Sequence, residues 1–374
     1  MSGIYIHIPF CKQACHYCDF HFSTNLSMAE DMVDMICREI ELRKDYLSTN
    51  PTIKTIYFGG GTPSMLSASQ LEKILSTIYK NYPIALEELT IETNPDDLKK
   101  EKLDNLKTLG FDRLSIGIQS FDANILKYYN RAHNAEESLR AIDASKDAGF
   151  EKLSIDLIYG FPHEDHSIWE RDLSIAVSQD PGHISSYCLT VEPHTALGNW
   201  ANKGRFKPAT EDFSAEQFEM LQDTMEKADY IQYEISNFGK TGQFALHNTN
   251  YWKSVPYLGI GPSAHSFDGT ERGSNVANNA VYIKNLSKGL HSFTTDPMSR
   301  EDLINEYILT SLRTIWGADI DELNKGTKED FLTLKASLLK QLENEKLIEI
   351  KGNHLHLSKK GKLLADSIAA SLFI

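Results

Sequence analysis

The chain has 374 residues, and 52 acidic against 38 basic side chains give it a formal net charge of −14. With 41% hydrophobic and 24% charged residues, its composition is that of a globular protein larger than one small domain, which excludes a disordered or fibrous chain. The acidity disfavours nucleic acid as main partner, no apolar run reaches the length of a membrane span, and the first residues lack a secretory signal, so we expect a cytoplasmic protein and leave peripheral membrane contact open.

Apolar runs typical of strands alternate with amphipathic helices over the first two hundred residues. The predicted strands cover residues 3–8, 53–58, 88–92, 113–118, 153–158 and 184–191, and the main helices cover 28–46, 68–79, 98–109, 135–148 and 167–178. Six β/α units in succession favour a parallel sheet with crossover helices. Because a full barrel needs eight such units, we predict an α/β fold with a partial (β/α)6 barrel of the TIM type, whose chemistry lies at the carboxyl ends of the strands.

The alternation stops near residue 200. Residues 1–200 are therefore predicted to form the barrel core, and 201–299 a loop-rich extension that completes the barrel domain. Residues 300–374 are predicted to form a helical, winged-helix-like domain, in which helical patterns at 301–315, 328–345 and 359–371 flank a hairpin with the turn Lys351-Gly352-Asn353. Ten basic and twelve acidic residues from position 301 onward leave this part with a net charge of −2, which speaks against DNA binding.

Three of the five cysteines, Cys11, Cys15 and Cys18, form the pattern C-x3-C-x2-C just after the first predicted strand. Such a triplet is rare by chance in a chain this poor in cysteine, which favours a metal centre over plain thiols. An iron–sulfur cluster fits three thiolates and leaves one of its four irons open for a small molecule. Zinc stays an alternative, because a nearby histidine could complete a tetrahedral site: His7, His16 or His21. Cys37 and Cys188 are predicted to be ordinary buried residues.

Polar groups that suit a zwitterionic ligand follow the predicted strands in order. The glycine-rich turn that contains Gly60, Gly61 and Thr62 offers open backbone groups after the second strand. Further polar side chains end or follow the next three strands: Glu92, Gln119, Arg131 and Asp156. A carboxylate within an apolar strand costs free energy unless it is paired, which makes Glu92 and Asp156 binding-site candidates, although a buried structural carboxylate explains each one alone about as well.

The segment YIHIPFCKQACHYCDF, with Tyr17 just before the last cysteine, resembles the radical S-adenosylmethionine superfamily. It is most similar to the family of oxygen-independent coproporphyrinogen III oxidases and their haem-chaperone relatives, and the likeness extends over essentially the whole chain. This resemblance implies that Cys11, Cys15 and Cys18 hold a [4Fe-4S] cluster, whose fourth iron is chelated by the amino and carboxylate groups of S-adenosylmethionine.

The resemblance also implies which residues bind this ligand. They are assigned by role: the methionine amino end to Gly60, Gly61, Thr62 and Glu92, its carboxylate to Arg131, the ribose to Gln119 and Asp156, and the flanks to Tyr5 and Tyr17. The planar fork of an arginine suits a carboxylate, which supports the second assignment. Thr190, at the end of the sixth predicted strand, is a further cofactor-binding candidate.

Two features separate the branches of this family. The oxidase branch carries a fourth cysteine two residues after the third, whereas this chain has Phe20 there, as in the chaperone branch. Downstream, the string HNTNYW places an imidazole beside two large aromatic side chains, and it matches the haem box of the chaperone branch: His247, Asn248, Tyr251 and Trp252. His265 follows farther on, and the sequence does not decide its role.

We therefore predict a haem chaperone that carries a [4Fe-4S] cluster, binds S-adenosylmethionine and haem, and delivers haem to acceptor haemoproteins. The alternative is an oxygen-independent coproporphyrinogen III oxidase, which decarboxylates its substrate to protoporphyrinogen IX. A zinc-stabilised binding module is a third interpretation, and whether the chain is an enzyme stays open.

Overall fold

A large sheet of twelve strands runs through the computed structural model, which describes residues 2–47, 52–327 and 329–374. At its centre are six parallel strands in chain order, each paired with the next. They are β1 (Ser2–Ile8), β2 (Ile53–Gly60), β3 (Ile84–Thr93), β4 (Arg113–Gln119), β5 (Lys152–Tyr159) and β6 (Gly182–Cys188). This arrangement confirms the predicted α/β fold with a parallel sheet.

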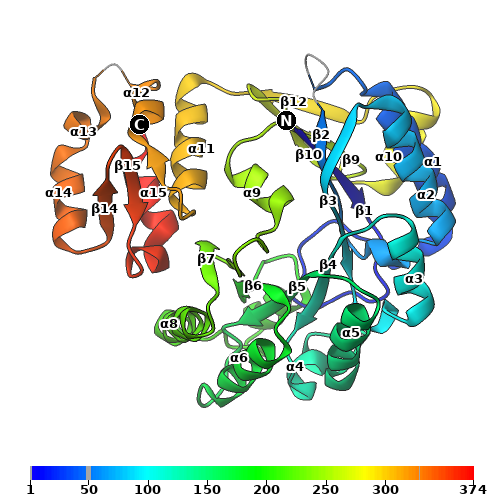
Figure 1. The fold of residues 1–374 in the computed structure, drawn as a ribbon, viewed down its shortest axis with the longest axis horizontal. Coiled ribbons are helices and arrows are strands. Elements are labelled where there is room, and N and C mark those ends of the chain that lie inside the picture. The colour runs from blue at the N-terminus through cyan, green and yellow to red at the C-terminus, as the bar shows by residue number, and fades with distance from the viewer. Residues whose placement is uncertain (1, 48–51, 328) are drawn as a thin grey trace.

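Helices connect these strands and cover the outer face of the sheet (Figure 1). They are α1 (Ala29–Leu42), α2 (Ala68–Asn81), α3 (Lys100–Thr108), α4 (Ala123–Tyr128), α5 (Ala135–Asp147) and α6 (Ser167–Gln179), with single 3-10 turns η1 (Leu26–Met28), η2 (Pro63–Met65) and η3 (Pro95–Asp97). Capping boxes begin α2 and α5, where the side chains of Ser67 and Asn134 accept hydrogen bonds from the backbone of the first turn. The predictions missed α4, because a helix of six residues is too short to show a clear apolar period.

Residues on the six strands alternate between two faces. On β1, Ile4 and Ile6 are fully buried in the core shared with the helices, whereas Tyr5 and His7 point to the opposite face. The same alternation places polar or aromatic side chains of the other strands on that inner face: Thr55, Tyr57, Glu88, Thr90, Glu92, Arg113, Ser115, Ser154, Asp156, His183, Ser185 and Tyr187. The hydrophobic core therefore lies between sheet and helices, and the inner face of the sheet is left to groups that can bind polar ligands.

The residues between 201 and 299 add strands at both edges of the sheet. Strands β8 (Asn237–Gly239) and β7 (Ile231–Glu234) extend it beyond β6, and β9 (Tyr257–Ile260), β10 (His265–Phe267), β11 (Glu271–Asn275) and β12 (Phe293–Pro297) extend it beyond β1. Among the described residues, four helices lie in this part of the chain or enter it: α7 (Ala196–Asn202), α8 (Glu211–Lys227), α9 (Leu246–Trp252) and α10 (Asn279–Ser287). The described strands pair in one row from β12 to β7, so the sheet is open.

Residues from 300 onward fold around a second, smaller core. Their elements are α11 (Arg300–Leu312), β13 (Ala318–Asp319), α12 (Ile320–Asn324), α13 (Phe331–Leu334), α14 (Ala336–Asn344), β14 (Ile348–Lys351), β15 (His354–Leu357), η4 (Gly361–Leu364) and α15 (Ala365–Leu372). Gly352 takes a left-handed conformation (φ 60°) in the predicted hairpin turn. The prediction of a single helix over 328–345 is wrong in part, because the helix is interrupted at Lys335 between α13 and α14. Lys328 lies outside the described residues.

Helix α9 (Leu246–Trp252) lies between the sheet and these C-terminal elements (Figure 1). Arg313, which follows α11, places its guanidinium 5.3 Å from the ring centroid of Trp252 and donates to the buried carboxylate of Glu234 on β7 at 3.0 Å. The C-terminal part is helical, as predicted, whereas the domain limits at 200 and 300 stay predictions. No helix in the described ranges has both the length and the apolar character that crossing a membrane requires.

Candidate functional site

The three clustered cysteines lie in the loop that follows β1. This loop folds back on itself, because the Cys11 N–H donates to the carbonyl of Ser23 at 3.0 Å. Two side chains from other parts of the chain reach the thiols: Thr62, just after β2, donates its hydroxyl to Cys11 Sγ at 3.7 Å, and Arg131, between α4 and α5, donates Nη1 to Cys15 Sγ at 3.4 Å. The loop therefore holds its sulfur atoms over the carboxyl ends of the strands, where the chemistry was expected.

These thiols are electrostatically linked. Burial raises the pKa of Cys11 to about 12 and that of Cys18 to about 11, and repulsion between neighbouring cysteines adds to both shifts. The sulfur atoms therefore share one region, and thiolates there need a cation to stabilise them. Within the described ranges, no three His, Cys, Asp or Glu side chains converge on a single metal ion. Three thiols in one loop suit an iron–sulfur cluster, and the zinc alternative stays open.

Glu92, on the inner face of β3, meets the glycine-rich turn after β2. Its Oε2 accepts a hydrogen bond from the Gly60 N–H at 3.1 Å, and its Oε1 accepts one from the Tyr57 hydroxyl at 2.8 Å. Burial raises the pKa of Glu92 to about 7, because these two hydrogen bonds offset only part of the cost of burying the charge. A buried carboxyl group near its titration midpoint at neutral pH suits a cationic partner such as an ammonium group.

The glycine-rich turn packs directly against the cysteine loop. The Thr62 N–H donates to the carbonyl of Phe10 at 2.7 Å, and a Cβ on Gly61 would lie only 2.5 Å from that same carbonyl oxygen. Gly60 has a φ of 107°, a conformation that side-chain-bearing residues rarely adopt. Both glycines thus have a packing role in joining β1 to β2, in addition to the ligand contact predicted for them.

The Arg131 guanidinium has one N–H donor that is not used in a hydrogen bond among the described residues. Its Nη2 donates to Asn94 Oδ1 at 2.6 Å and to the Gly117 carbonyl at 2.8 Å, and its Nη1 donates to the Tyr17 hydroxyl at 3.4 Å. Its Nε is buried and has no hydrogen-bond partner among the residues that the structure describes. Buried polar atoms are rarely left unpaired, so a guanidinium of this kind is suited to an incoming carboxylate.

Gln119 and Asp156 lie beside Arg131 on adjacent strands. A Cβ on Gly117 would lie 3.1 Å from both Gln119 Nε2 and Arg131 Nη2, which places those two side chains together. Asp156 accepts from the Ser115 hydroxyl at 3.3 Å, and burial raises its pKa to about 6. Glu92, Gln119, Arg131 and Asp156 therefore gather at the carboxyl half of the inner face.

The two remaining candidates for this ligand differ from each other. Tyr5 lies on the inner face of β1, with its ring stacked on Tyr57 at 6.0 Å between centroids. Thr190 is exposed in the loop after β6, and none of the side-chain hydrogen bonds in the described ranges joins it to the other candidates. The strand predicted to reach residue 191 is wrong, because β6 ends at Cys188, opposite the last residue of its partner β5. Tyr187 instead ends the inner face of β6.

The HNTNYW string forms α9 and points its histidine into the sheet. The His247 Nδ1 lies 2.8 Å from the hydroxyl oxygen of Thr55, and its ring lies 5.2 Å from that of Tyr57 at an interplanar angle of 30°. A Cβ on Gly3 would lie 3.1 Å from the imidazole, so the absence of a side chain there makes room for the ring. Burial lowers the pKa of His247 to about 4, which keeps the imidazole neutral, the form that ligates metals.

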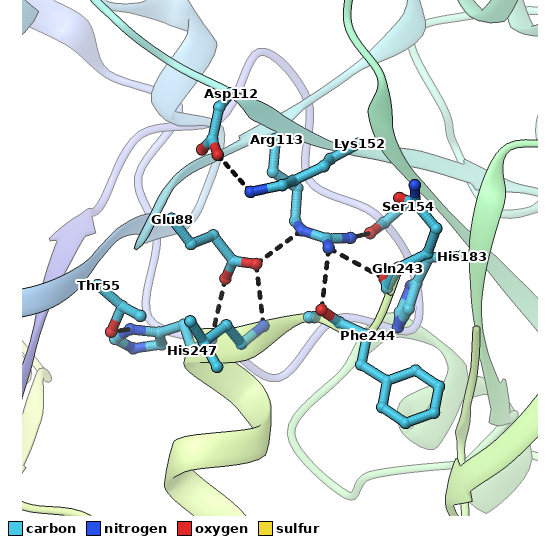
Figure 2. Close-up of polar contacts among 12 residues, drawn as sticks. Thr55, Glu88, Asp112, Arg113, Lys152, Ser154, His183, Gln243, Phe244 and His247 are labelled. Atoms are coloured by element: carbon cyan, nitrogen blue, oxygen red, sulfur yellow. Dashed lines mark hydrogen bonds and ion pairs between the residues drawn. The ribbon is translucent and has the colours of Figure 1, made fainter. Parts of the chain in front are cut away.

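A buried ion pair anchors the start of α9 (Figure 2). The Glu88 carboxylate accepts from the backbone N–H groups of Leu246 and His247, both at 2.9 Å, and from Arg113 Nε at 2.9 Å. The guanidinium of Arg113 also donates to the carbonyls of Gln243 and Phe244 at 3.0 Å. Because the side chains of Glu88 and Arg113 are only 2% and 1% exposed, this pair holds the segment before α9 within a dry part of the inner face.

The other residues of the predicted haem box lie on the same helix as His247. Tyr251 is partly exposed and packs edge-on against Trp252 at 5.2 Å, and Asn248 is partly buried. A hollow of about 10 Å³ beside this helix, enough for roughly one water molecule, is lined in part by Thr55, His247 and Tyr251. This hollow is too small for a macrocycle.

Comparison with known proteins is consistent with this arrangement. A model of the radical SAM superfamily matches residues 5–174, and a model of the HemN C-terminal domain matches residues 298–364. The heme chaperone HemW of Bacillus subtilis (strain 168) is 35% identical, over 98% of both chains, and that of Lactococcus lactis is 32% identical, over 98% of this chain and 96% of the other.

The chain belongs to the HemW family. The solved structure of coproporphyrinogen III oxidase (HemN) from Escherichia coli, described as a radical SAM enzyme, is similar with a TM-score of 0.85, over 100% of this chain and 90% of that one. Its sequence identity is 21%, so this likeness shows the fold alone.

Two further residues singled out in the sequence, Phe20 and His265, are exposed. Phe20, which stands where the oxidase branch has a cysteine, is 74% exposed on the cysteine loop. His265 is exposed at the start of β10. Burial lowers the pKa of the nearby His7 to about 4, and repulsion from His265 adds a smaller part of this shift. The functional role of His265 therefore stays undecided.

Sequence reasoning missed four residues of this HemW-family chain that join its predicted sites: Thr55, Tyr57, Glu88 and Arg113. All four lie on the inner face, and the signal that could have found them is the alternation of polar with apolar residues along each strand.

Proposed function

We propose that this HemW-family protein is a haem chaperone that binds haem at α9 and delivers it to an acceptor haemoprotein. The observation that carries the proposal is the neutral imidazole of His247, held by Thr55 through Nδ1. When Nδ1–H donates to the threonine oxygen, the free lone pair is on Nε2, which is then the nitrogen left to bind iron. Two relatives named heme chaperone HemW, which match over 98% and 96% of their own lengths, support the same function.

The residues around His247 suit a haem. Tyr251 and Trp252 would flank the macrocycle, and Asn248 would lie beside it on the same helix. Lys253 follows directly, rests 3.8 Å from the ring centroid of Trp316 and has no carboxylate partner in the described part of the chain. Its ammonium group is therefore available to a haem propionate.

At the carboxyl ends of the strands we propose a [4Fe-4S] cluster on Cys11, Cys15 and Cys18, with S-adenosylmethionine beside it. The cluster would supply an electron for chemistry on that ligand. Glu92 would pair with the ligand's ammonium group, and the unpartnered Nε of Arg131 would donate to its carboxylate.

Haem titration of anaerobically reconstituted protein tests the proposal. The expected result is a Soret band that saturates near one haem per chain and that the H247A variant weakens strongly, while variant H291A, altered at an exposed histidine outside α9, behaves as the unmodified protein. Loaded protein should then pass its haem to an apo-haemoprotein. An equal titration of H247A and H291A would contradict the assignment of the site.

The competing function is oxygen-independent oxidation of coproporphyrinogen III. Its support is the fold shared with HemN. Incubation of reconstituted protein with dithionite, S-adenosylmethionine and coproporphyrinogen III decides the matter, because protoporphyrinogen IX forms only if the oxidase function is present.

A further inference from the structure

Tyr57 touches one residue from each of the two proposed ligand sites. It lies on the inner face of β2, between Thr55 and Gly59. Its hydroxyl donates to Glu92 Oε1 at 2.8 Å, and its ring lies against the imidazole of His247, 5.2 Å between centroids. The residue proposed to hold the S-adenosylmethionine ammonium and the residue proposed to ligate haem are therefore separated by a single side chain.

The ring of Tyr57 has little freedom of its own. Tyr5 stacks on it at 6.0 Å and 28°, and His247 lies against it at 30°. The imidazole of His247 is confined in turn by Thr55, which precedes Tyr57 by two residues on β2, and by the backbone at Gly3. A change in the hydrogen bond between Tyr57 and Glu92 therefore changes how the Tyr57 ring packs against the imidazole of His247.

We propose that Tyr57 couples the two sites, so that S-adenosylmethionine bound at Glu92 strengthens the binding of haem at His247. This inference rests on the proposed function. Without a ligand, burial raises the pKa of Glu92 and favours its neutral form. A ligand ammonium group stabilises the carboxylate, and a hydrogen bond from Tyr57 to a charged acceptor is stronger than one to a neutral acid.

The stronger hydrogen bond fixes the Tyr57 ring against His247 before haem arrives. A histidine held in its binding position loses less conformational freedom on ligation, which tightens haem binding. Because coupling between two sites is reciprocal, haem must strengthen the binding of S-adenosylmethionine by the same factor. Couplings of this kind typically amount to a factor of about 5 to 150.

Haem titrations of reconstituted protein with and without saturating S-adenosylmethionine test the coupling. In the unmodified protein we expect the ligand to tighten haem binding about fivefold or more. Variant Y57F keeps the ring but removes the hydroxyl. It should still bind each ligand, but its haem affinities with and without S-adenosylmethionine should have a ratio near one. Variant Y79F, altered at an exposed tyrosine of α2, should retain the full ratio.

The outcomes separate the coupling from the function on which it rests. Unmodified protein that binds no haem overturns the proposed function and the coupling with it. If S-adenosylmethionine leaves haem binding unchanged, the coupling alone is overturned. The same holds if S-adenosylmethionine strengthens haem binding equally in Y57F and in the unmodified protein. The reciprocal titration, S-adenosylmethionine with and without haem, needs no variant, and an affinity for S-adenosylmethionine that haem leaves unchanged overturns the coupling even if Y57F does not fold.

Discussion

His247 and Thr55 are 192 residues apart in the chain, yet the Nδ1 of one lies 2.8 Å from the hydroxyl oxygen of the other. The contact brings the HNTNYW helix against the second strand of the sheet. It also gives the histidine a hydrogen bond on one ring nitrogen, an arrangement that orients metal-ligating imidazoles in many proteins.

Replacement of Thr55 by valine should weaken haem binding. T55V keeps the size of the side chain but removes the hydroxyl, so it frees the imidazole to rotate and to change tautomer. Partners of this kind typically change metal affinity by about 10- to 100-fold. A Soret titration measures the effect, with T77V as the matched control, because Thr77 lies on the outer helix α2. Equal affinities in the two variants would contradict the role of Thr55.

Replacement of Glu88 by alanine should destabilise the protein strongly. The change leaves the buried guanidinium of Arg113 without its carboxylate and α9 without the acceptor for two N–H groups. Breaking a buried ion pair in this way costs about 3–5 kcal/mol in the free energy of unfolding. Denaturant unfolding measures the loss.

The matched control for E88A is E136A, which breaks an ion pair with Arg140 in which the two side chains are 83% and 65% exposed. An exposed pair of this kind contributes at most about 0.5 kcal/mol. Similar losses of unfolding free energy in E88A and E136A would show that the ion pair between Glu88 and Arg113 does not stabilise the fold.

The sequence predicted those parts of the molecule that depend on local patterns. The six parallel strands follow from apolar runs, and the cysteine loop follows from the spacing of Cys11, Cys15 and Cys18. The end of β6 was predicted wrongly at residue 191, because the end of a strand depends on the length of its neighbour. The place of α9 was not predictable either, since its anchors Thr55 and Glu88 lie on strands far away in the sequence.

The affinity for S-adenosylmethionine should rise with pH between about 6 and 8. Burial raises the pKa of Glu92 to about 7, so below that value the ligand's ammonium group must displace a proton before it can pair with the carboxylate. Above about pH 8 most of the carboxylate is already charged, and the affinity levels off. Asp156, whose pKa is raised to about 6, adds a smaller change at the lower end.

Equilibrium binding at a series of pH values measures this dependence. Variant E92Q carries a neutral amide and should bind more weakly, with a flat profile above pH 7. The same raised pKa makes the neutral acid the easier form to bury, so the stability of the ligand-free protein should fall as pH rises from about 4.5 to 7. A profile of E92Q as steep as that of the unmodified protein would exclude Glu92 as the titrating group.

Replacement of Cys15 by serine should abolish the cluster. With one thiolate of three removed, one iron loses its only protein ligand, and reconstituted C15S should lack both the brown colour and stoichiometric acid-labile sulfide. C188S is the matched control, because Cys188 is a free thiol at the end of β6, outside the cysteine loop, and its replacement should leave about four irons per chain in place. Iron and sulfide analysis after anaerobic reconstitution measures both. A colourless unmodified protein with one zinc ion would contradict the cluster and restore the zinc interpretation.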